Sequence, residues 1–94
     1  MADEYEIRYS PQAANDVRGL RAYDRKEVLD GIEQHLLREP TRVSRSRIKR
    51  MLQPFWSEFR LRIDLFGVYY DVDDAARVVF ILRVLEKDTG TTPI

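Results

Sequence analysis

The segment WSEFRLRIDLFGVYYDVDDAARVVFILRV, residues 56–84, decides the fold. Apolar residues and arginines alternate from Phe59 to Ile63, which is the period of a half-buried β-strand. A short turn is expected over residues 64–67, where Gly67 best tolerates a positive φ. Residues 68–72 are β-branched and aromatic, and residues 78–84 are almost wholly apolar, as in a buried central strand. The segment therefore predicts three consecutive antiparallel strands onto which the remaining chain must pack.

The same alternation assigns side chains to the two faces of this sheet. The apolar residues of the first strand share one face, which leaves Arg60 and Arg62 on the other. In the second strand either alternating set could face these arginines. One set contains two valines, Val68 and Val72, and is therefore expected to be buried. We thus expect Tyr69 and Asp71, from the other set, to point outward with the arginines.

Length and composition predict one domain, residues 1–94, with a single modest core. The chain has no cysteine and one histidine, His35, so no disulfide, metal or cofactor is expected. His35 is expected at the surface or an edge rather than in catalysis. There is no apolar run of membrane-spanning length and no signal peptide, so the expected location is the cytoplasm. Residues 86–94 are polar and are expected to be a frayed tail.

Charge is unevenly distributed although the total is zero. Residues 41–62 contain seven basic residues and one acidic residue, a local charge of +6, so the rest of the chain sums to −6. The basic residues are Arg42, Arg45, Arg47, Lys49, Arg50, Arg60 and Arg62, against Glu58. Such a patch indicates a polyanion or an acidic partner, and the alternative is a solvated arginine-rich loop.

The first half of the chain predicts a strand and two helices. Residues 4–9 alternate as a half-buried strand, and Ser10 with Pro11 then starts a helix that reaches about Tyr23. A second helix is expected with Asp24 as its N-cap and an end before Pro40. Residues 47–52 are interpreted as an irregular edge strand with outward arginines. The predicted fold is α+β: an N-terminal strand, a helical hairpin, then a three- to four-stranded antiparallel sheet.

Four segments in this order resemble the RelE/ParE superfamily of bacterial type II toxins over residues 4–87. They are YEIRYSPQAANDVRGL, DRKEVLDGIEQHLLREP, SRSRIKRM, and FRLRIDLFGVYYDVDD followed by VVFILRV. The resemblance implies a RelE-like fold and a toxin neutralised by a cognate antitoxin. RelE-like members cleave messenger RNA in the ribosomal A site, whereas ParE-like members poison DNA gyrase.

The resemblance carries over to some residues of this chain and not to others. Arg60 and Arg62 match the basic side chains that RelE-type toxins place on the concave face of this strand. Lys87 matches a basic residue that often follows the last core strand. Gly67 stands where the family has an arginine, and no aromatic residue follows Lys87. Two expected catalytic features are therefore absent.

RNA cleavage by attack of a 2′-hydroxyl needs a base, an acid and stabilisation of the phosphorane charge. Arginines supply the last of these, and proton transfer is open to Tyr69, Tyr70, Asp71 or Glu58. Arg83 lies inside an apolar strand, so it must either be paired or reach the concave face. The predicted catalytic residues are Arg60, Arg62, Lys87, Arg83 and Tyr69. The predicted nucleic-acid-binding residues are Arg45, Arg47, Lys49, Arg50, Arg60 and Arg62.

Three functions are compatible with these residues: a RelE-like ribosome-dependent endoribonuclease with a reduced catalytic set, a ParE-like toxin that binds gyrase, and a degenerate member that binds only its antitoxin. The expected partners are a cognate antitoxin and either the ribosome with messenger RNA or DNA gyrase, with no membrane. The antitoxin would wrap the sheet and the hairpin and place acidic side chains on the basic patch.

Overall fold

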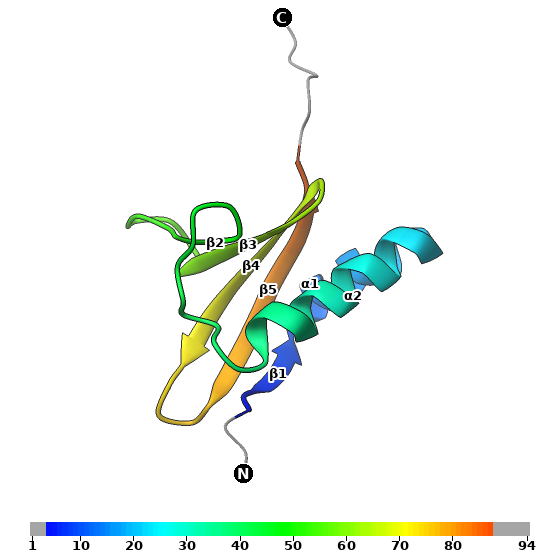
Figure 1. Cartoon of the computed structure of the whole chain (residues 1–94). Coiled ribbons are helices and arrows are strands. Elements are labelled where there is room, and N and C mark those ends of the chain that lie inside the picture. The colour runs from blue at the N-terminus through cyan, green and yellow to red at the C-terminus, as the bar shows by residue number, and fades with distance from the viewer. Residues whose placement is uncertain (1–3, 88–94) are drawn as a thin grey trace, which may run out of the picture.

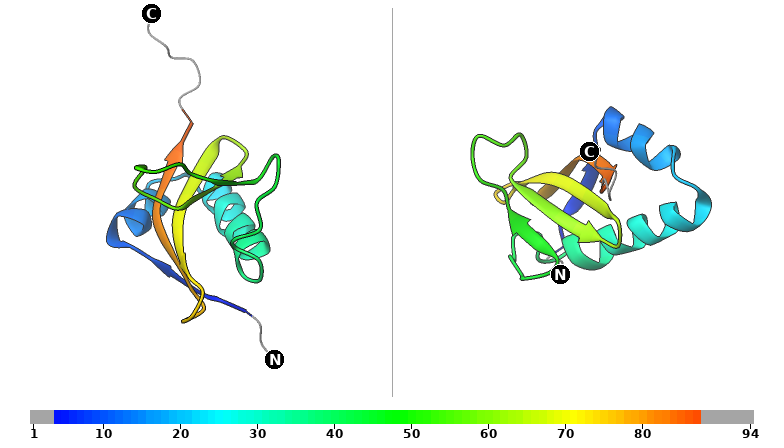
Figure 2. Two further views of the ribbon diagram at one scale, coloured as in Figure 1. Left: turned by 90° about the vertical axis from the view of Figure 1, so that its left-hand side faces the viewer. Right: turned by 90° about the horizontal axis from the view of Figure 1, so that it is seen from above.

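The computed structural model describes residues 4–87, which form one five-stranded sheet with two helices on one side (Figures 1 and 2). The strands and helices, in chain order, are β1 (Glu6–Tyr9), α1 (Pro11–Arg18), α2 (Ala22–Leu36), β2 (Ile48–Arg50), β3 (Phe59–Ile63), β4 (Phe66–Asp73) and β5 (Val78–Glu86). The predicted α+β class and element order are confirmed.

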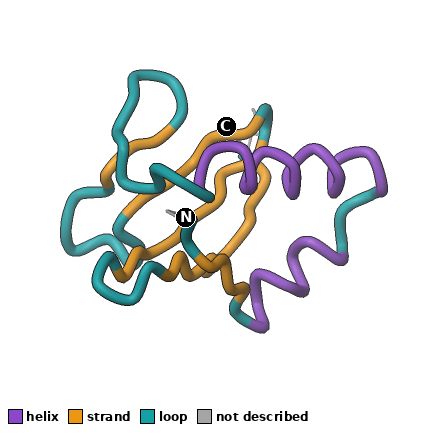
Figure 3. Tube along the Cα trace, turned by 60° about the horizontal axis from the view of Figure 1, so that its bottom comes forward, coloured by secondary structure: helices purple, strands orange, loops and turns teal. Residues whose placement is uncertain are grey.

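The strands are arranged in the order β1-β5-β4-β3-β2. Strands β2 to β5 pair antiparallel with their neighbours in sequence, which confirms the predicted meander. Strand β1 pairs with β5 in parallel, so the complete sheet is mixed. Strand β2 is an edge strand as predicted, but it spans only three residues. Figure 3 shows the longer loops at the end of the sheet away from the turn that joins the two helices.

The turn between β3 and β4 is tighter than predicted. Only Asp64 and Leu65 separate the two strands, and Asp64 takes the positive φ, at 54°. Aspartate tolerates this conformation because its short polar side chain can bond locally. Gly67 lies inside β4 opposite Arg62, so its expected role in the turn was wrong.

The start of α1 and the end of α2 agree with the sequence prediction, whereas the end of α1 and the start of α2 differ from it. Ser10 caps α1, with its Oγ accepting a hydrogen bond from the amide of Ala13 at 3.0 Å. The helix ends at Arg18, before Gly19, rather than near Tyr23. Helix α2 begins at Ala22 and has Arg21 at its N-cap position, so the assignment of Asp24 as the N-cap was wrong. It ends at Leu36, four residues before Pro40.

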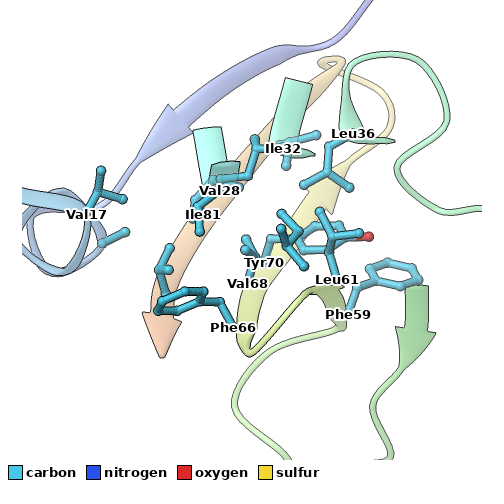
Figure 4. Close-up of a cluster of buried hydrophobic side chains, with 14 of the residues drawn as sticks. Val17, Val28, Ile32, Leu36, Phe59, Leu61, Phe66, Val68, Tyr70 and Ile81 are labelled. Carbon is cyan, nitrogen blue, oxygen red and sulfur yellow. The ribbon is translucent and has the colours of Figure 1, made fainter. Parts of the chain in front are cut away.

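The core fills the space between the helices and the sheet (Figure 4). Val28, Ile32 and Leu36 of α2 are fully buried against the inward side chains of β3, β4 and β5. Tyr70 is also fully buried, and its hydroxyl donates to the carbonyl of Pro40 at 2.6 Å. This bond fixes the loop after α2 to the middle of the sheet, and burial raises the pKa of Tyr70.

The last strand extends beyond the predicted end of the core. Glu86 belongs to β5, and the amide of Lys87 donates to the carbonyl of Leu65 at 2.6 Å. The expectation of a frayed tail was therefore wrong for Glu86 and Lys87, and the rest of that tail, residues 88–94, lies outside the described residues.

Candidate nucleic-acid interface

Basic side chains lie on the face of the sheet that the helices leave uncovered. Arg60 and Arg62 alternate with the buried residues of β3 and point to this face, as predicted. Lys49 on β2 and Tyr69 on β4 are the direct cross-strand neighbours of Arg60. Arg62 lies opposite Gly67, two residues further along β3 and β4. Three cations and one tyrosine are thus brought together from three strands.

Two further aromatic residues reach this face from the loop between β2 and β3. The rings of Phe55 and Trp56 stack with their centroids 4.9 Å apart. The ring of Tyr69 lies 5.0 Å from Trp56 and 5.8 Å from Phe55. Trp56 is half exposed. We call the set Lys49, Phe55, Trp56, Arg60, Arg62 and Tyr69 the basic aromatic face.

Gly67 makes room for the tyrosine of this face. A Cβ atom at residue 67 would lie 3.1 Å from Cε1 and 3.3 Å from Cζ of Tyr69, which is closer than most side chains tolerate. The position where the family resemblance implies an arginine is therefore occupied by the ring of Tyr69.

The two arginines of this face lack partners for part of their hydrogen-bonding groups. The Nε atoms of Arg60 and Arg62 are buried without a hydrogen-bond partner among the described residues. Burial lowers the pKa of the Arg60 guanidinium, and the neighbouring Arg62 charge lowers it further. Buried donors without acceptors are costly, and adjacent like charges repel. A bound anion would relieve the repulsion between the two charges.

The candidates for proton transfer differ in how far they are already engaged. The carboxylate of Asp71 accepts from the amide of Glu58 at 2.8 Å, and that of Glu58 accepts from the amide of Val72 at 2.9 Å. Tyr70 points into the core, opposite to Tyr69. Tyr69 is therefore the candidate whose hydroxyl lies on the basic aromatic face, as the valine argument predicted.

Arg83 is paired with a carboxylate that sequence reasoning missed. Its Nε and Nη2 donate to the two carboxylate oxygens of Asp16 on α1, at 2.7 and 3.0 Å. The amide of Val84 donates to the same carboxylate at 2.9 Å. These bonds, that from Arg83 above all, lower the pKa of Asp16. Of the two alternatives expected for Arg83, the structure shows the paired one, so this guanidinium does not join Arg60 and Arg62 in one anion site.

The predicted basic patch does not form a single surface. The ring of Phe59 packs under Arg50, whose Cζ lies 4.7 Å from the ring centroid, on the side of the sheet that faces the helices. Arg47 lies beside His35 at the end of α2, and its Nη1 donates to the carbonyl of Arg62 at 3.3 Å. Arg45 is exposed in the preceding loop. Of the predicted nucleic-acid-binding residues, only Lys49, Arg60 and Arg62 share the basic aromatic face.

Other groups define the limits of this face. Lys87 is exposed beside the turn between β3 and β4, since its amide binds Leu65. At the opposite end of β4, four carboxylates and Phe80 line a shallow hollow: Glu58, Asp71, Asp73 and Asp74. The uncovered side of the sheet is thus polarised from basic to acidic along β4.

Phe55 and Trp56 were missed as site residues although they adjoin the arginine-rich strand. An aromatic pair directly before alternating arginines is the signal that could have identified them. Within residues 4–87 no group of three metal-binding side chains was found. Neither of the two helices is long and apolar enough to cross a membrane.

Comparison with known proteins places this geometry in a family. The family model described as the ParE toxin of type II toxin–antitoxin systems, parDE, matches residues 7–89. The toxin–antitoxin complex RelBE2 from Mycobacterium tuberculosis contains a similar chain, with a TM-score of 0.75 and 27% identity over 89% of this chain and 99% of that one. The archaeal RelE–RelB complex from Pyrococcus horikoshii OT3 also contains a similar chain. Its TM-score is 0.69 and its sequence identity is 18%, over 93% of this chain and 99% of that one. No curated protein sequence matches significantly.

Proposed function

The chain belongs to the ParE toxin family of type II toxin–antitoxin systems, within the RelE/ParE superfamily, and from this premise we propose that it acts on messenger RNA through its basic aromatic face. The observation that carries the proposal is the pair of arginines, Arg60 and Arg62, on one uncovered face of the sheet beside the half-exposed ring of Trp56. Cations next to exposed aromatic rings are the combination that single-stranded nucleic acids bind.

The charged and aromatic side chains of this face can bind different parts of an RNA strand. The guanidinium groups of Arg60 and Arg62 present planar forks of donors to phosphate oxygens, and Lys49 adds a third positive charge. The ring of Trp56, supported from behind by Phe55 and Tyr69, offers a surface on which a base can stack. Backbone and base are therefore held by different side chains.

Cleavage would follow from this binding mode with the ribosome presenting the message. The 2′-oxygen of one nucleotide attacks the adjacent phosphorus as its proton passes to water, the bond to the 5′-oxygen of the next nucleotide breaks, and that oxygen takes up a proton. Arg60 and Arg62 stabilise the negative charge that develops on the phosphorane. The hydroxyl of Tyr69, the cross-strand neighbour of Arg60, is the group placed to donate a proton to the leaving 5′-oxygen.

A cognate antitoxin is the expected protein partner, because the similar chain from M. tuberculosis was solved in a toxin–antitoxin complex. We propose that acidic side chains of the antitoxin bind the basic aromatic face. There they would occupy the arginines that RNA requires and so neutralise the toxin by direct competition.

DNA gyrase is the second candidate target. It is favoured by the matched family model, which describes ParE toxins. It is also favoured because the basic aromatic face has no histidine for proton transfer, since the one histidine of the chain, His35, belongs to α2. A toxin that only binds gyrase needs no group for proton transfer. The two targets therefore differ in whether Tyr69 matters chemically.

Primer extension on a message translated in vitro tests the proposal. We expect the protein to produce new 5′ ends only when ribosomes are present, and we expect the double variant Arg60→Ala with Arg62→Ala to produce none. Arg45→Ala is the matched control, because it removes a charge from an exposed loop away from the face.

An intact message in the presence of the wild-type protein would refute RNA cleavage. Inhibition of gyrase supercoiling by the same preparation would then assign the second target. Loss of that inhibition in the double variant would retain the basic aromatic face as the binding surface.

A further inference from the structure

A second basic site lies away from the basic aromatic face, where the end of α2 meets the loop that leads to β2. A cavity of about 420 Å³ opens there, which is within the size range of sites for small ligands. It is lined by Gln34, His35, Arg38, Glu39, Arg42, Ser44, Arg47 and Ile48. Three elements of the fold contribute to it: the last turn of α2, the loop and the first residue of β2.

The lining carries an excess of positive charge. Arg38, Arg42 and Arg47 give three charges against the one of Glu39, with His35 neutral. Arg38 is also paired with Glu4, outside the lining, at 3.5 Å, so about one positive charge is left over. Arg42 pairs with Glu39 at 2.9 Å, but the two side chains are 75% and 61% exposed. Exposed pairs of this kind contribute little and rearrange readily. The guanidinium of Arg42 is therefore available to a stronger anionic partner.

Ser44 adds a neutral donor to these charges. Its Oγ accepts hydrogen bonds from the amides of Arg47 and Ile48, at 3.1 and 3.2 Å. A hydroxyl that accepts twice still has its proton to donate. Because both amides fix the position of this oxygen, the donor is held at the wall of the cavity.

The positive potential of the cavity also acts on His35. Burial lowers the pKa of this histidine, and the nearby charge of Arg47 lowers it further. His35 and Arg47 also line a second, neighbouring hollow along α2, and this hollow contains Glu27 and Asp30. His35 thus lies between a basic and an acidic region, where its protonation responds to any added charge.

We propose that this cavity binds a phosphate monoester, with Arg42 and Arg47 contacting the phosphate oxygens and Ser44 donating a further hydrogen bond. A phosphate monoester offers three terminal oxygens to these two guanidinium groups and the hydroxyl, whereas a carboxylate offers only two. Guanidinium forks match phosphate geometry in two-point contacts. The volume leaves room for a nucleoside on the phosphate, so inorganic phosphate and a nucleotide present the same chemistry here.

His35 is the only histidine of the chain, so its NMR signal reports on this cavity without ambiguity. The test is a pH titration of the imidazole protons with inorganic phosphate, with adenosine monophosphate, and with sodium chloride at matched ionic strength. We expect either phosphate compound to raise the pKa of His35 by roughly half a unit or more, because an anion beside it favours the charged imidazolium. A larger effect of adenosine monophosphate would identify the nucleotide as the ligand, and equal effects would identify free phosphate.

Variants connect the response to the proposed contacts. Arg42→Gln and Arg47→Gln, each made alone, should abolish the phosphate-dependent shift, whereas Arg45→Gln in the same loop should retain it. The double variant Arg60→Ala with Arg62→Ala should also retain it, so this site can be tested whether or not the RNA proposal holds.

A response no larger than that to chloride would refute the phosphate site, as would an equal response in Arg42→Gln and Arg47→Gln. A response to a glutamate-rich peptide without one to phosphate would likewise overturn it and assign the cavity to a protein partner.

Discussion

The carboxylate of Asp16 accepts a backbone hydrogen bond at the edge of β5 that a neighbouring strand would otherwise accept. Strand β1 pairs with β5 only as far as Ile81, and beyond that point the edge of β5 faces α1. Asp16 accepts the amide of Val84 there, and Arg83 holds the carboxylate in place with two hydrogen bonds. The arginine inside an apolar strand is therefore explained by architecture rather than by catalysis.

Replacement of Asp16 by asparagine should destabilise the fold in a pH-dependent way. At neutral pH we expect a loss of about 1–3 kcal/mol in the free energy of unfolding, because the buried amide of Val84 and the partly exposed guanidinium of Arg83 lose a charged acceptor. The folded state lowers the pKa of Asp16, so its contribution is present above the unfolded value, near pH 4, and is lost as pH falls through the lower folded value. Urea unfolding of both proteins at several pH values measures this.

The difference between wild type and Asp16→Asn should shrink below about pH 4. Asp30→Asn is the control, because Asp30 forms an exposed i,i+4 pair with Lys26 and should change stability by less than about 0.5 kcal/mol. A constant difference at all pH values would show that the charge of Asp16 does not stabilise the fold.

At the scale of elements, the close approach of α2 to β3 depends on Gly31. A Cβ atom at this residue would lie 2.6 Å from Cδ1 and 3.0 Å from Cγ1 of the buried Ile63. The absence of a side chain thus allows the helix to cover the strand whose opposite face carries Arg60 and Arg62.

Gly31→Ala should therefore destabilise the protein although alanine favours helices. The helical gain of about 1 kcal/mol is outweighed by overpacking of about 1–3 kcal/mol. Ile63→Val removes the clashing Cδ1, so in the Gly31→Ala background it should restore stability instead of reducing it. Thermal unfolding of the two single variants and the double variant gives this coupling.

Gly19→Ala is the matched control for this prediction. Its Cβ atom would meet only backbone oxygens at 3.6 Å, and its φ of −79° is accessible to alanine. We expect no loss of stability. Additive effects of Gly31→Ala and Ile63→Val would contradict the proposed steric contact.

The arginines of β3 should lower the stability of the fold rather than raise it. Lys49 lies directly opposite Arg60, and like charges in that arrangement are unfavourable. The double variant Arg60→Ala with Arg62→Ala should unfold at the same urea concentration as wild type or a higher one, while toxicity on induction is lost. A large loss of stability would mean that these side chains support the sheet rather than serve binding.

The elements that could be predicted from sequence were those with a regular local pattern. Alternation over five residues predicted correctly which side chains of β3 lie on each face of the sheet. The alternation is decisive because a shift of one residue would have buried both arginines. The positions of Arg47 and Arg50 could not be obtained in this way, since β2 is too short to impose alternation on them. The parallel pairing of β1 with β5 and the bond between Asp16 and Arg83 join residues far apart in sequence, where no local pattern exists.

At the scale of the whole molecule, the net charge is zero, but basic and acidic side chains lie in different regions of the uncovered side of the sheet. The basic aromatic face lies near one end of β4, and the hollow lined by Glu58, Asp71, Asp73 and Asp74 lies near the other. Zero net charge removes long-range attraction to a polyanion, so RNA binding must depend on local contacts at the basic end.

The salt dependence of RNA binding tests this separation of charge. For a single-stranded RNA, each phosphate contact contributes about 0.7 to the slope of log affinity against log salt concentration. We expect Arg60→Ala with Arg62→Ala to reduce that slope by about 1.4, measured by fluorescence anisotropy between about 50 and 200 mM salt. Arg45→Ala should leave the slope unchanged, because its charge lies in a loop away from the face. Equal slopes for wild type and the double variant would mean that RNA contacts another surface. In that case antitoxin and RNA would not compete for the same arginines.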